Sequence, residues 1–537
     1  MSDNALYYGD NLDVMRRYLK DESVDLIYLD PPFNSNADYN MLFGQRGEPV
    51  AAAQIIAFGD TWRWDTVAAA TWQEVVEAGG PVSKVMQAFR QFLGTNDMLA
   101  YLSMMAPRLL ELRRVLKPTG SIYLHCDPTA SHYLKMLMDA VFGPKNFRNE
   151  IVWERTTGRK GGHQFGRVHD VILFYAKTDK NVWNPPTIPQ TADTAKGHDI
   201  MVDADGTAYR VSDLTGPGQG PPRKFGDKLI APRTGRHWQF DQDGIDRLMS
   251  DGRIVFSGGG KPRLRTNIKD LPGVAVRDVW TDIEPINSAA QERMPYPTQK
   301  PIALLRRIIS ASCPPGGLVC DPFCGCGTTV DAAQEMGFPW VGIDITHLAI
   351  NAIKLRLHDR YHGKAEFKVI GEPVSLPDAV QLAKEDPYQF QFWSLGLVGA
   401  RPDVQKKGAD QGIDGRLFFH DESESGKTKQ IIFSVKAGNI RPAYVSELRG
   451  VIDREQAAIG VLITMEEPTK AMRTEAASAD FYISPFGKYP RLQILTIADL
   501  LSGKGIDYPS AAQRIDKTYK KAPKAKGATG ETPSLPL

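Results

Sequence analysis

The sequence predicts an α/β protein with an open parallel sheet covered by helices, joined to further domains. Short apolar runs alternate with amphipathic ones near the amino terminus, and the same alternation resumes after residue 300. The run Val24–Leu29 is apolar at nearly every position, which is typical of a strand that helices bury on both faces. The 537 residues suffice for three or four domains of about 150 residues each.

Composition excludes several classes of protein. Hydrophobic residues make up 42% and charged residues 24%, which excludes disorder for most of the chain. The net charge of +2 provides no global field for nucleic acid or membranes, so local patches must bind such partners. Five cysteines, no apolar stretch of about 18 residues and no signal peptide in MSDNALYYGD indicate a reduced, cytoplasmic setting without membrane contact.

The elements of the first part are predicted from apolar periodicity and from the prolines and glycines at their ends. A strand, a helix and a second strand open the chain, and a long helix ends before Pro118 and Gly120. A strand, a helix and two strands follow. In order, the predicted elements are Ala5–Tyr8, 12–19, Val24–Leu29, 98–116, 121–125, 129–142, 151–153 and 171–175.

Five segments are predicted in total. Residues 1–177 and 289–365 form the α/β part, and 178–288 form an inserted β-rich domain punctuated by turns such as GPGQGPP. Residues 386–510 form another α/β unit, with strands at Gly415–Phe419, 431–435 and 460–464 and helices at 389–398 and 445–456. The lysine- and proline-rich tail 511–537 is predicted to be disordered.

The first motif of chemical interest is Asp30-Pro31-Pro32-Phe33, directly after the strand Val24–Leu29. Alone it is a weak signal, because Asp-Pro-Pro often does no more than turn the chain at a strand end.

The second motif lies between a predicted strand and a predicted helix. It reads Asp321-Pro322-Phe323-Cys324-Gly325-Cys326-Gly327-Thr328-Thr329. Small residues at such a turn let backbone N–H groups approach a ligand, next to the positive end of the helix dipole. Asp344 ends the next predicted strand, where a carboxylate can accept hydrogen bonds from ribose hydroxyls. A glycine-rich turn without a ligand is the alternative.

Asp30 and Asp321 are both placed at the carboxyl ends of predicted parallel strands. In an open α/β sheet those ends line one crevice, and ligands bind there. The two motifs are therefore expected to meet in space, although they lie far apart in the sequence.

The glycine loop resembles the S-adenosylmethionine (SAM) loop of amino-methylating DNA methyltransferases, and Asp-Pro-Pro-Phe resembles their catalytic tetrapeptide. Three further stretches are similar to that family: YYGDN from Tyr7, SIYLHCD from Ser121 and YPTQKP from Tyr296. Because the tetrapeptide precedes the cofactor loop, the order resembles the circularly permuted β group, which has a Rossmann-like sheet. The resemblance covers residues 1–177 and 289–365.

This resemblance implies SAM as the cofactor and assigns roles to residues. The implied catalytic residues are Asp30, Pro31, Pro32 and Phe33. The implied cofactor-binding residues are Asp10, Thr298, Gln299, Lys300, Pro301, Asp321, Pro322, Phe323, Cys324, Gly325, Gly327, Thr328, Thr329 and Asp344. In this family Asp at the first tetrapeptide position usually goes with adenine N6 and Ser with cytosine N4, so adenine is the expected target.

The implied mechanism answers a chemical difficulty. The exocyclic amine of the base is a poor nucleophile, because its lone pair is delocalised into the ring. The Asp30 carboxylate and the Pro31 carbonyl can accept both amine hydrogens and aim the lone pair at the sulfonium methyl. Two prolines stiffen this loop, and Phe33 is expected to stack on a flipped-out base, with a core position as its alternative. For His125 and Asp127, a structural hydrogen bond is favoured over catalysis.

Two basic segments are predicted to contact double-stranded DNA: RTTGRKGGHQFGRVH from Arg155, and RKFGDKLIAPRTGRHW from Arg223. Basic side chains neutralise phosphates, and aromatic ones such as Phe225 and Trp238 can read or wedge bases. A solvated basic loop is the alternative. The predicted DNA-binding residues are Arg155, Arg159, Lys160, Arg167, Arg223, Lys224 and Arg236. The cluster Cys320, Cys324 and Cys326 lacks zinc-site spacing, so no metal site is predicted there.

The carboxyl-terminal unit resembles Mrr-type restriction endonuclease domains of the PD-(D/E)xK group, on the stretches KKGADQGIDG and IFSVK. Asp414 and Lys436 match the Asp and Lys of the nuclease motif, whereas Ser434 stands where a carboxylate or Gln should help to hold Mg²⁺. A degenerate nuclease fold that grips DNA or a partner is favoured. In the alternative, Glu447 restores the Mg²⁺ site and the domain cuts DNA.

The sequence therefore predicts a SAM-dependent DNA adenine-N6 methyltransferase of a restriction-modification or defence system. Two alternatives stay open: a cytosine-N4 methyltransferase, and a bifunctional methyltransferase and restriction endonuclease. The resemblance also implies a homodimer and restriction or defence-system subunits as partners.

Overall fold

The computed structural model describes most of the chain. The described residues are 4–32, 63–156, 163, 165–189, 200–203, 205–271, 273–287, 290, 292–294, 298–403, 412–421 and 428–509. Phe33, Arg159, Lys160 and the tail 511–537 lie outside them, so the expectations for these residues stay predictions. The chain divides into two compact units. One combines Met1–Trp183 with Thr281–Leu537, and the other is Asn184–Trp280.

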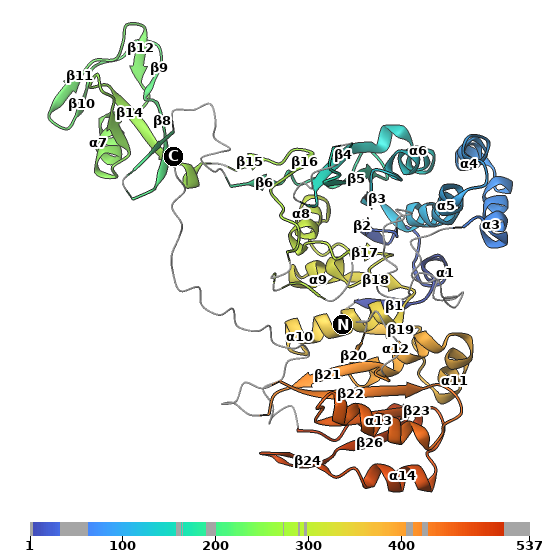
Figure 1. Ribbon diagram of the computed structural model, residues 1–537. Coiled ribbons are helices and arrows are strands. Elements are labelled where there is room, and N and C mark those ends of the chain that lie inside the picture. Colours follow the sequence, from blue (N-terminus) through green and yellow to red (C-terminus); the bar gives the residue numbers. More distant parts are fainter. Residues whose placement is uncertain are drawn as a thin grey trace. The chain divides into compact units, whose positions relative to one another are not determined.

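The first unit is built around a mixed sheet (Figure 1). Strands β2, β17, β18 and β1 are parallel to one another, whereas β5 is antiparallel to both β3 and β4. The predicted parallel sheet is thus confirmed at its centre and wrong at β5. Nearly every residue of β5 is buried, so its apolar pattern could not reveal its direction. In spatial order the strands are β4 (Phe147–Glu154), β5 (His169–Ala176), β3 (Leu116–Cys126), β2 (Val24–Leu29), β17 (Val319–Asp321), β18 (Trp340–Asp344), β1 (Ala5–Tyr8) and β19 (Lys368–Ile370).

Helices cover both faces of this sheet. Figure 1 shows α8, α9 and α10 on one face and α1, α5 and α6 on the other, while α3 and α4 pack beside α5. Helix α5 buries most of its length, with Leu102 and Leu109 fully inaccessible to solvent. The helices are α1 (Asn11–Tyr18), α3 (Thr66–Glu77), α4 (Gly80–Leu93), α5 (Asp97–Val115), α6 (Ser131–Phe142), α8 (Ile302–Ser312), α9 (Thr328–Glu335) and α10 (His347–Tyr361).

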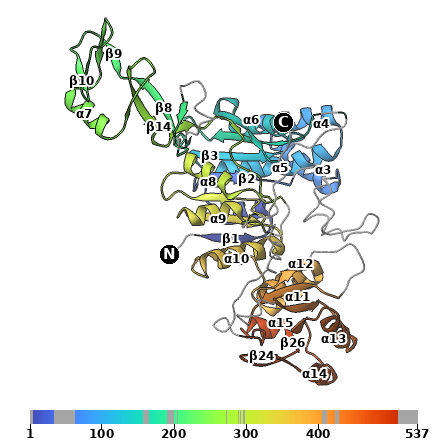
Figure 2. The same ribbon diagram turned by 60° about the vertical axis from the view of Figure 1, so that its left-hand side comes forward.

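The C-terminal domain of the first unit, residues 376–509, has a second sheet. Strands β22, β23 and β26 are parallel, and β21 is antiparallel to β22. Helices α11, α12 and α15 cover one face and α13 and α14 the other, as Figure 2 shows. The elements are α11 (Leu376–Glu385), α12 (Pro387–Leu397), β20 (Arg401–Pro402), β21 (Gly415–Phe419), β22 (Lys429–Lys436), α13 (Ala443–Arg454), β23 (Ile459–Thr464), α14 (Lys470–Ala477), β24 (Phe481–Ser484), β25 (Gly487–Pro490), β26 (Leu492–Thr496) and α15 (Ile497–Leu501).

Helix α12 packs directly on α10, so the C-terminal domain contacts the helix that follows β18. The Gln389 side chain accepts a hydrogen bond from the His347 N–H at 2.8 Å, and Asn351 donates to the Phe392 carbonyl at 2.6 Å. These buried bonds satisfy groups that an apolar contact would leave without partners.

The second unit contains short strands, one longer helix and a small core. Leu214, Phe225, Ile245 and Leu248 form that core. Its elements are β6 (Thr187–Ile188), β7 (Ile200–Val202), β8 (Ala208–Asp213), β9 (Thr215–Pro217), β10 (Arg223–Phe225), β11 (Lys228–Ile230), β12 (Arg236–Trp238), α7 (Gln242–Ser250), β13 (Ile254–Phe256), β14 (Pro262–Asn267), β15 (Val274–Ala275) and β16 (Val279–Trp280).

Two general properties complete the fold. Within the described part of the chain, no helix combines the length and the apolar character needed to cross a membrane. All five cysteines are buried thiols, and burial raises the pKa of each, to about 12 for Cys313. Buried thiols of this kind are poor nucleophiles.

Candidate active site

Four acidic residues follow four adjacent strands at one edge of the main sheet, which we call the acidic edge. Asp30 comes directly after β2, Asp321 and Asp344 end β17 and β18, and Asp10 comes two residues after β1. These strands are parallel neighbours in this order, so their carboxyl ends share one edge. At about 4.8 Å per strand the row spans roughly 14 Å. The sequence placed both motifs at such an edge, and the strand order brings them together.

Asp30 is held by a lysine from a distant part of the chain. The Lys300 ammonium lies 2.5 Å from Oδ2 of Asp30, and the two side chains are only 11% and 18% exposed. Lys300 was assigned to the cofactor by resemblance, whereas the structure places its ammonium on the carboxylate of the predicted catalytic tetrapeptide. The pair therefore orients the Asp30 carboxylate at the acidic edge.

The glycine turn is fixed from beneath by Asp321, which is buried. Its Oδ1 accepts a hydrogen bond from the Phe323 N–H at 3.0 Å, and its Oδ2 accepts one from the Thr329 hydroxyl at 2.5 Å. Asp321 thus ties the end of β17 to the first turn of α9. Gly327 precedes α9 with φ at +77°, and a Cβ atom there would lie 2.6 Å from Ile353 Cγ1, so only glycine fits.

Asp344 supports the same turn from the neighbouring strand. Its Oδ2 accepts a hydrogen bond from the Gly325 N–H at 2.9 Å, and its Oδ1 accepts bonds from the N–H and the hydroxyl of Thr346 at 3.0 and 2.9 Å. The next residue, Ile345, is 41% exposed although it is apolar. The sequence analysis did not include Ile345 among the candidate site residues. The structure adds it as a candidate, because its apolar side chain is exposed next to Asp344.

Two carboxyl groups of the acidic edge, those of Asp321 and Asp344, resist ionisation because they are buried. Burial raises the pKa of Asp321 to about 7, with the negative charges of Asp30 and Asp344 adding to the effect. Burial likewise raises the pKa of Asp344 to about 6. A cation bound beside these two acids would favour their ionised forms.

Asp10 is anchored by an arginine that the sequence did not single out. Its Oδ1 caps α1 by accepting from the Leu12 N–H at 2.8 Å, and Arg108 of α5 lies 2.5 Å from its Oδ2. Arg108 also donates to Asn11 at 2.6 Å, and Asn11 donates to the Pro322 carbonyl at 2.8 Å. This chain of bonds connects α5 through α1 to the glycine turn. A charged residue in the middle of the apolar stretch Met104–Leu110 was the available signal.

The segment Thr298–Pro301 leads into α8. Thr298 has φ at +62°, and Pro301 occupies the cap position immediately before the helix. The Gln299 side chain braces the segment, because it accepts from the Met294 N–H at 2.7 Å and donates to the Glu292 carbonyl at 2.6 Å. Of this predicted group, Lys300 is the residue whose side chain reaches Asp30.

A buried polar network lies in the strands behind Asp30. The Tyr28 hydroxyl and Nδ1 of His125 are 2.8 Å apart, and Nε2 of His125 lies 3.1 Å from Oδ2 of Asp170. Burial opposes ionisation of Asp170, but the hydrogen bond from His125 and the charges of Lys300 and Arg155 outweigh it, so its pKa is lowered. His125 is fully buried, which agrees with the structural role favoured for it.

The predicted DNA-binding residues have different surroundings. Arg155 pairs with Asp170 at 3.1 Å and is still 45% exposed, and Arg167 and Lys224 are exposed. Arg236 donates to the Thr215 hydroxyl and carbonyl at 2.7 and 2.6 Å. Arg223 is half-buried in β10.

The base-wedging role suggested for Phe225 is wrong. Its side chain is 2% exposed and packs against Trp238 at 4.9 Å in the core of the second unit. Its basic neighbours in the sequence suggested that Phe225 lies on the surface. The small domain instead uses this aromatic side chain to build its core.

The residues of the C-terminal domain that resemble a nuclease site are also described, except for 404–411. Asp414 accepts from the Val435 N–H at 2.6 Å and from the Gln391 amide at 3.1 Å. Ser434 is buried, and Glu447 is exposed on α13. In the described ranges no three His, Cys, Asp or Glu side chains cluster as a metal site would require.

The Asp30–Lys300 pair predicts an energetic coupling. We expect Asp30→Asn and Lys300→Met each to destabilise the protein, and the double variant to lose less than the sum, by about 1–2 kcal/mol. The reason is that each single change leaves a half-buried charge without its partner. Urea unfolding of the four proteins at low salt measures this term. Strictly additive losses would show that the two charges do not interact.

From the raised pKa of Asp321 we expect that removing its charge by substitution stabilises the folded protein, and more so at high pH than at low pH. Burial raises its pKa in the folded protein to about 7, whereas an unfolded Asp has a pKa of about 3.9, so the cost of burying this carboxyl grows as pH rises from about 4 to about 7 and is constant above that. Asp321→Asn keeps the shape without the charge, so it should stabilise the protein by roughly 1–3 kcal/mol at pH 8 and by little at about pH 4. Thermal unfolding of both proteins at the two pH values tests this. An equal difference at both would contradict it.

Comparisons with known proteins place this geometry in a family. The DNA methylase (N6/N4 methyltransferase) family model matches residues 24–355, and a model of NACHT-associated inactive restriction endonuclease 1 matches residues 388–501. The chain is 31% identical to type II methyltransferase M.EcaI of Enterobacter cloacae over 48% of this chain and 57% of that protein. It is 23% identical to DNA adenine methyltransferase YhdJ of Escherichia coli K12 over 67% of this chain and 85% of that protein.

A solved structure gives a weaker likeness. The chain is 15% identical to a putative DNA modification methylase of Thermus thermophilus complexed with S-adenosyl-L-methionine, with a TM-score of 0.33 over 68% of this chain and 100% of that one. This chain spans about half the length of the first curated relatives that it matches. The match to residues 24–355 covers more than half of the chain, and the chain therefore belongs to the DNA methylase family.

Proposed function

We propose that this protein transfers a methyl group from SAM to the N6 amine of adenine in double-stranded DNA, within a restriction-modification or defence system. The observation that carries the proposal is the acidic edge, where Asp30 of the Asp-Pro-Pro loop stands beside the glycine turn that starts at Asp321. An acceptor for the target amine and a turn for the methyl donor are thus neighbours on adjacent strands.

Several features of the glycine turn and its neighbours support SAM as the ligand. Gly325 and Gly327 carry no side chains, so a ligand can approach the backbone of the turn closely. We expect the Asp344 carboxylate to accept hydrogen bonds from the ribose hydroxyls and the exposed side chain of Ile345 to contact the adenine ring. A bound cation would favour ionisation of Asp321, whose pKa burial raises to about 7. When bound, SAM supplies an electrophilic methyl group on a positively charged sulfur.

The Asp-Pro-Pro loop supplies the acceptors for the target base. The Asp30 carboxylate and the Pro31 carbonyl would each accept one hydrogen of the exocyclic amine, which turns the nitrogen lone pair towards the methyl group. Lys300 orients the carboxylate through Oδ2. The target base must leave the duplex to reach this depth, because its amine is otherwise paired. Permutation of the type seen in the β group accounts for the tetrapeptide preceding the cofactor turn.

Adenine is the preferred target for two reasons. Asp30 at the first tetrapeptide position is typical of adenine-specific members, and one relative is a DNA adenine methyltransferase by name. Cytosine N4 is the second candidate, since its amine presents the same chemistry to Asp30.

Transfer of a labelled methyl group to duplex DNA tests the proposal. The full chain with labelled SAM and genomic duplex DNA should yield N6-methyladenine, which mass spectrometry of the digested nucleosides separates from N4-methylcytosine. Asp30→Ala should lower the rate by at least 100-fold, because it removes a preorganised acceptor. Arg306→Gln, far from Asp30 on the exposed side of α8, is the matched control and should keep the rate. Exclusive N4-methylcytosine would replace the adenine assignment, and no product with active cofactor binding would refute methyl transfer.

For the C-terminal domain we propose that it does not cleave DNA. Ser434 cannot supply the negative charge that a Mg²⁺ site needs, and the Asp414 carboxylate is bonded to two neutral donors of the protein. Similarity to an inactive restriction endonuclease model over residues 388–501 supports the same conclusion.

Incubation with unmethylated duplex tests this second point. The full chain with Mg²⁺ or Mn²⁺, and without SAM, should leave supercoiled plasmid intact at equimolar protein for hours. Gel electrophoresis detects a single nick per plasmid. Nicking that disappears in Asp414→Ala would instead establish a bifunctional enzyme, with Glu447 as the first residue to examine for the missing ligand.

A further inference from the structure

The C-terminal domain has a pocket at the carboxyl end of β22, outside the acidic edge. Its volume is about 420 Å³. Strand β22 ends at Lys436, residues 437–442 turn the chain, and α13 begins at Ala443. Crevices at the carboxyl ends of parallel strands, such as β22 and β23, are the places where α/β domains bind ligands.

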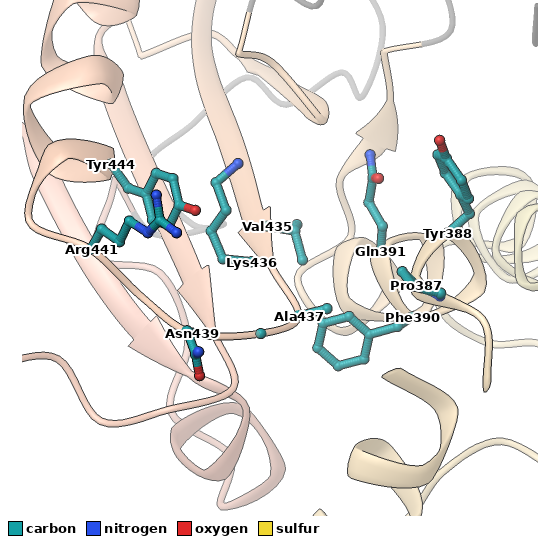
Figure 3. Close-up of a pocket in the computed structure, with 11 residues that line it drawn as sticks. Pro387, Tyr388, Phe390, Gln391, Val435, Lys436, Ala437, Asn439, Arg441 and Tyr444 are labelled. Atoms are coloured by element: carbon teal, nitrogen blue, oxygen red, sulfur yellow. The ribbon is translucent and has the colours of Figure 1, made fainter. Parts of the chain in front are cut away.

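The lining of this pocket is cationic and aromatic. Figure 3 shows Lys436, Arg441 and Tyr444 on one side of the pocket and Tyr388 and Gln391 of α12 on the other. Among the described residues that line the pocket, none is an Asp or a Glu. The Lys436 ammonium lies 5.0 Å from the centre of the Tyr444 ring, which holds the charge beside an aromatic face.

The nearby carboxylates are directed to other partners. Asp414 is bonded to the Val435 N–H at 2.6 Å and to Gln391 at 3.1 Å, and Asp386 caps α12 through the N–H groups of Tyr388 and Gln389. With Ser434 in place of an acid, the position that resembles a metal-dependent nuclease site has kept its lysine and lost a negative ligand. The remaining charge favours an anion rather than a metal ion.

We propose that this pocket binds one nucleotide unit of DNA, its phosphate on Lys436 and Arg441 and its base on the exposed ring of Tyr388, without a metal ion. Arg and Lys are the usual partners of phosphate, and bases stack on aromatic rings with little regard to sequence. Tyr388 is 43% exposed, so its ring is accessible to a base. The pocket would give the chain a second hold on DNA, independent of the methyl-transfer reaction.

Binding of a labelled 12-mer oligothymidylate to the full chain in EDTA tests this proposal. Thymine has no exocyclic amine, so the probe cannot accept a methyl group at the acidic edge. Lys436→Gln combined with Arg441→Gln should weaken binding at least tenfold and lower the slope of log affinity against log salt by about 0.7, as expected for one lost phosphate contact on a single strand. Fluorescence anisotropy measures both quantities.

A matched pair of substitutions controls for net charge. Lys470 and Lys488 are exposed in the same domain and lie outside the pocket, so changing both to Gln should alter the affinity less than twofold. Equal losses in the two pairs, an unchanged affinity in the pocket variant, or binding that appears only with Mg²⁺ would each overturn the proposal.

Two further experiments distinguish the contribution of the base from that of the phosphate, and binding at this pocket from binding at the acidic edge. Tyr388→Ala should weaken oligothymidylate at least fivefold, yet leave competition by inorganic phosphate unchanged; thymidine monophosphate, compared with the 12-mer, shows whether a free nucleotide suffices. Asp30→Ala should bind the probe as the parent does, even if methyl transfer is absent. Loss of probe binding in Asp30→Ala would place the binding at the acidic edge and refute the pocket.

Discussion

Burial of the Asp321 carboxylate is the constraint on which the arrangement of the site depends. Its two oxygens hold the Phe323 N–H and the Thr329 hydroxyl, so one side chain joins the end of β17, the glycine turn and the start of α9. The same burial raises its pKa to about 7, because the ionised carboxylate is less stable inside the protein than in water. Buried acids that are costly to the fold are characteristic of functional sites, where a ligand relieves the cost.

Among the described ion pairs, the one that Asp30 makes is with Lys300. Lys300 follows the inserted domain in the sequence, whereas Asp30 precedes it. The loop that carries Lys300 is braced by Gln299 and ends at Pro301, where α8 starts. Parallel strands that are distant in the chain can therefore assemble one site, because each carries its functional residue at the same end. Arg108 does comparable work for Asp10 and Asn11 from the middle of α5. The site is held by charges contributed from helices as much as from loops.

The sequence predicted those strands and motifs that depend on the pattern of apolar residues, prolines and glycines within a short segment. The run Val24–Leu29 and the run Gly415–Phe419 form strands with the predicted bounds, because short apolar runs bounded by polar or turn-forming residues are typical of buried strands. The direction of β5 and the pair α3 and α4 were not predicted, since tertiary packing decides both. Lys300 was expected at the cofactor, and its contact with Asp30 depends on a register between distant segments that no local pattern encodes. Phe225 was misread because a small core and a binding surface draw on the same residue types.

The main sheet and the C-terminal domain of the first unit carry opposite charges at their candidate sites, and this difference bears on their roles. The acidic edge gathers four carboxyl groups around the turn proposed to bind SAM, whereas the described lining of the pocket in the C-terminal domain has Lys436 and Arg441 and no acid. In a metal-dependent nuclease, lysine and carboxylates balance one another around the ion. With Ser434 in the position of the acid, the proposed role of Lys436 is to attract a phosphate directly, without a metal ion. A lost catalytic ligand can thus convert a cleaving site into a holding site without any change of fold.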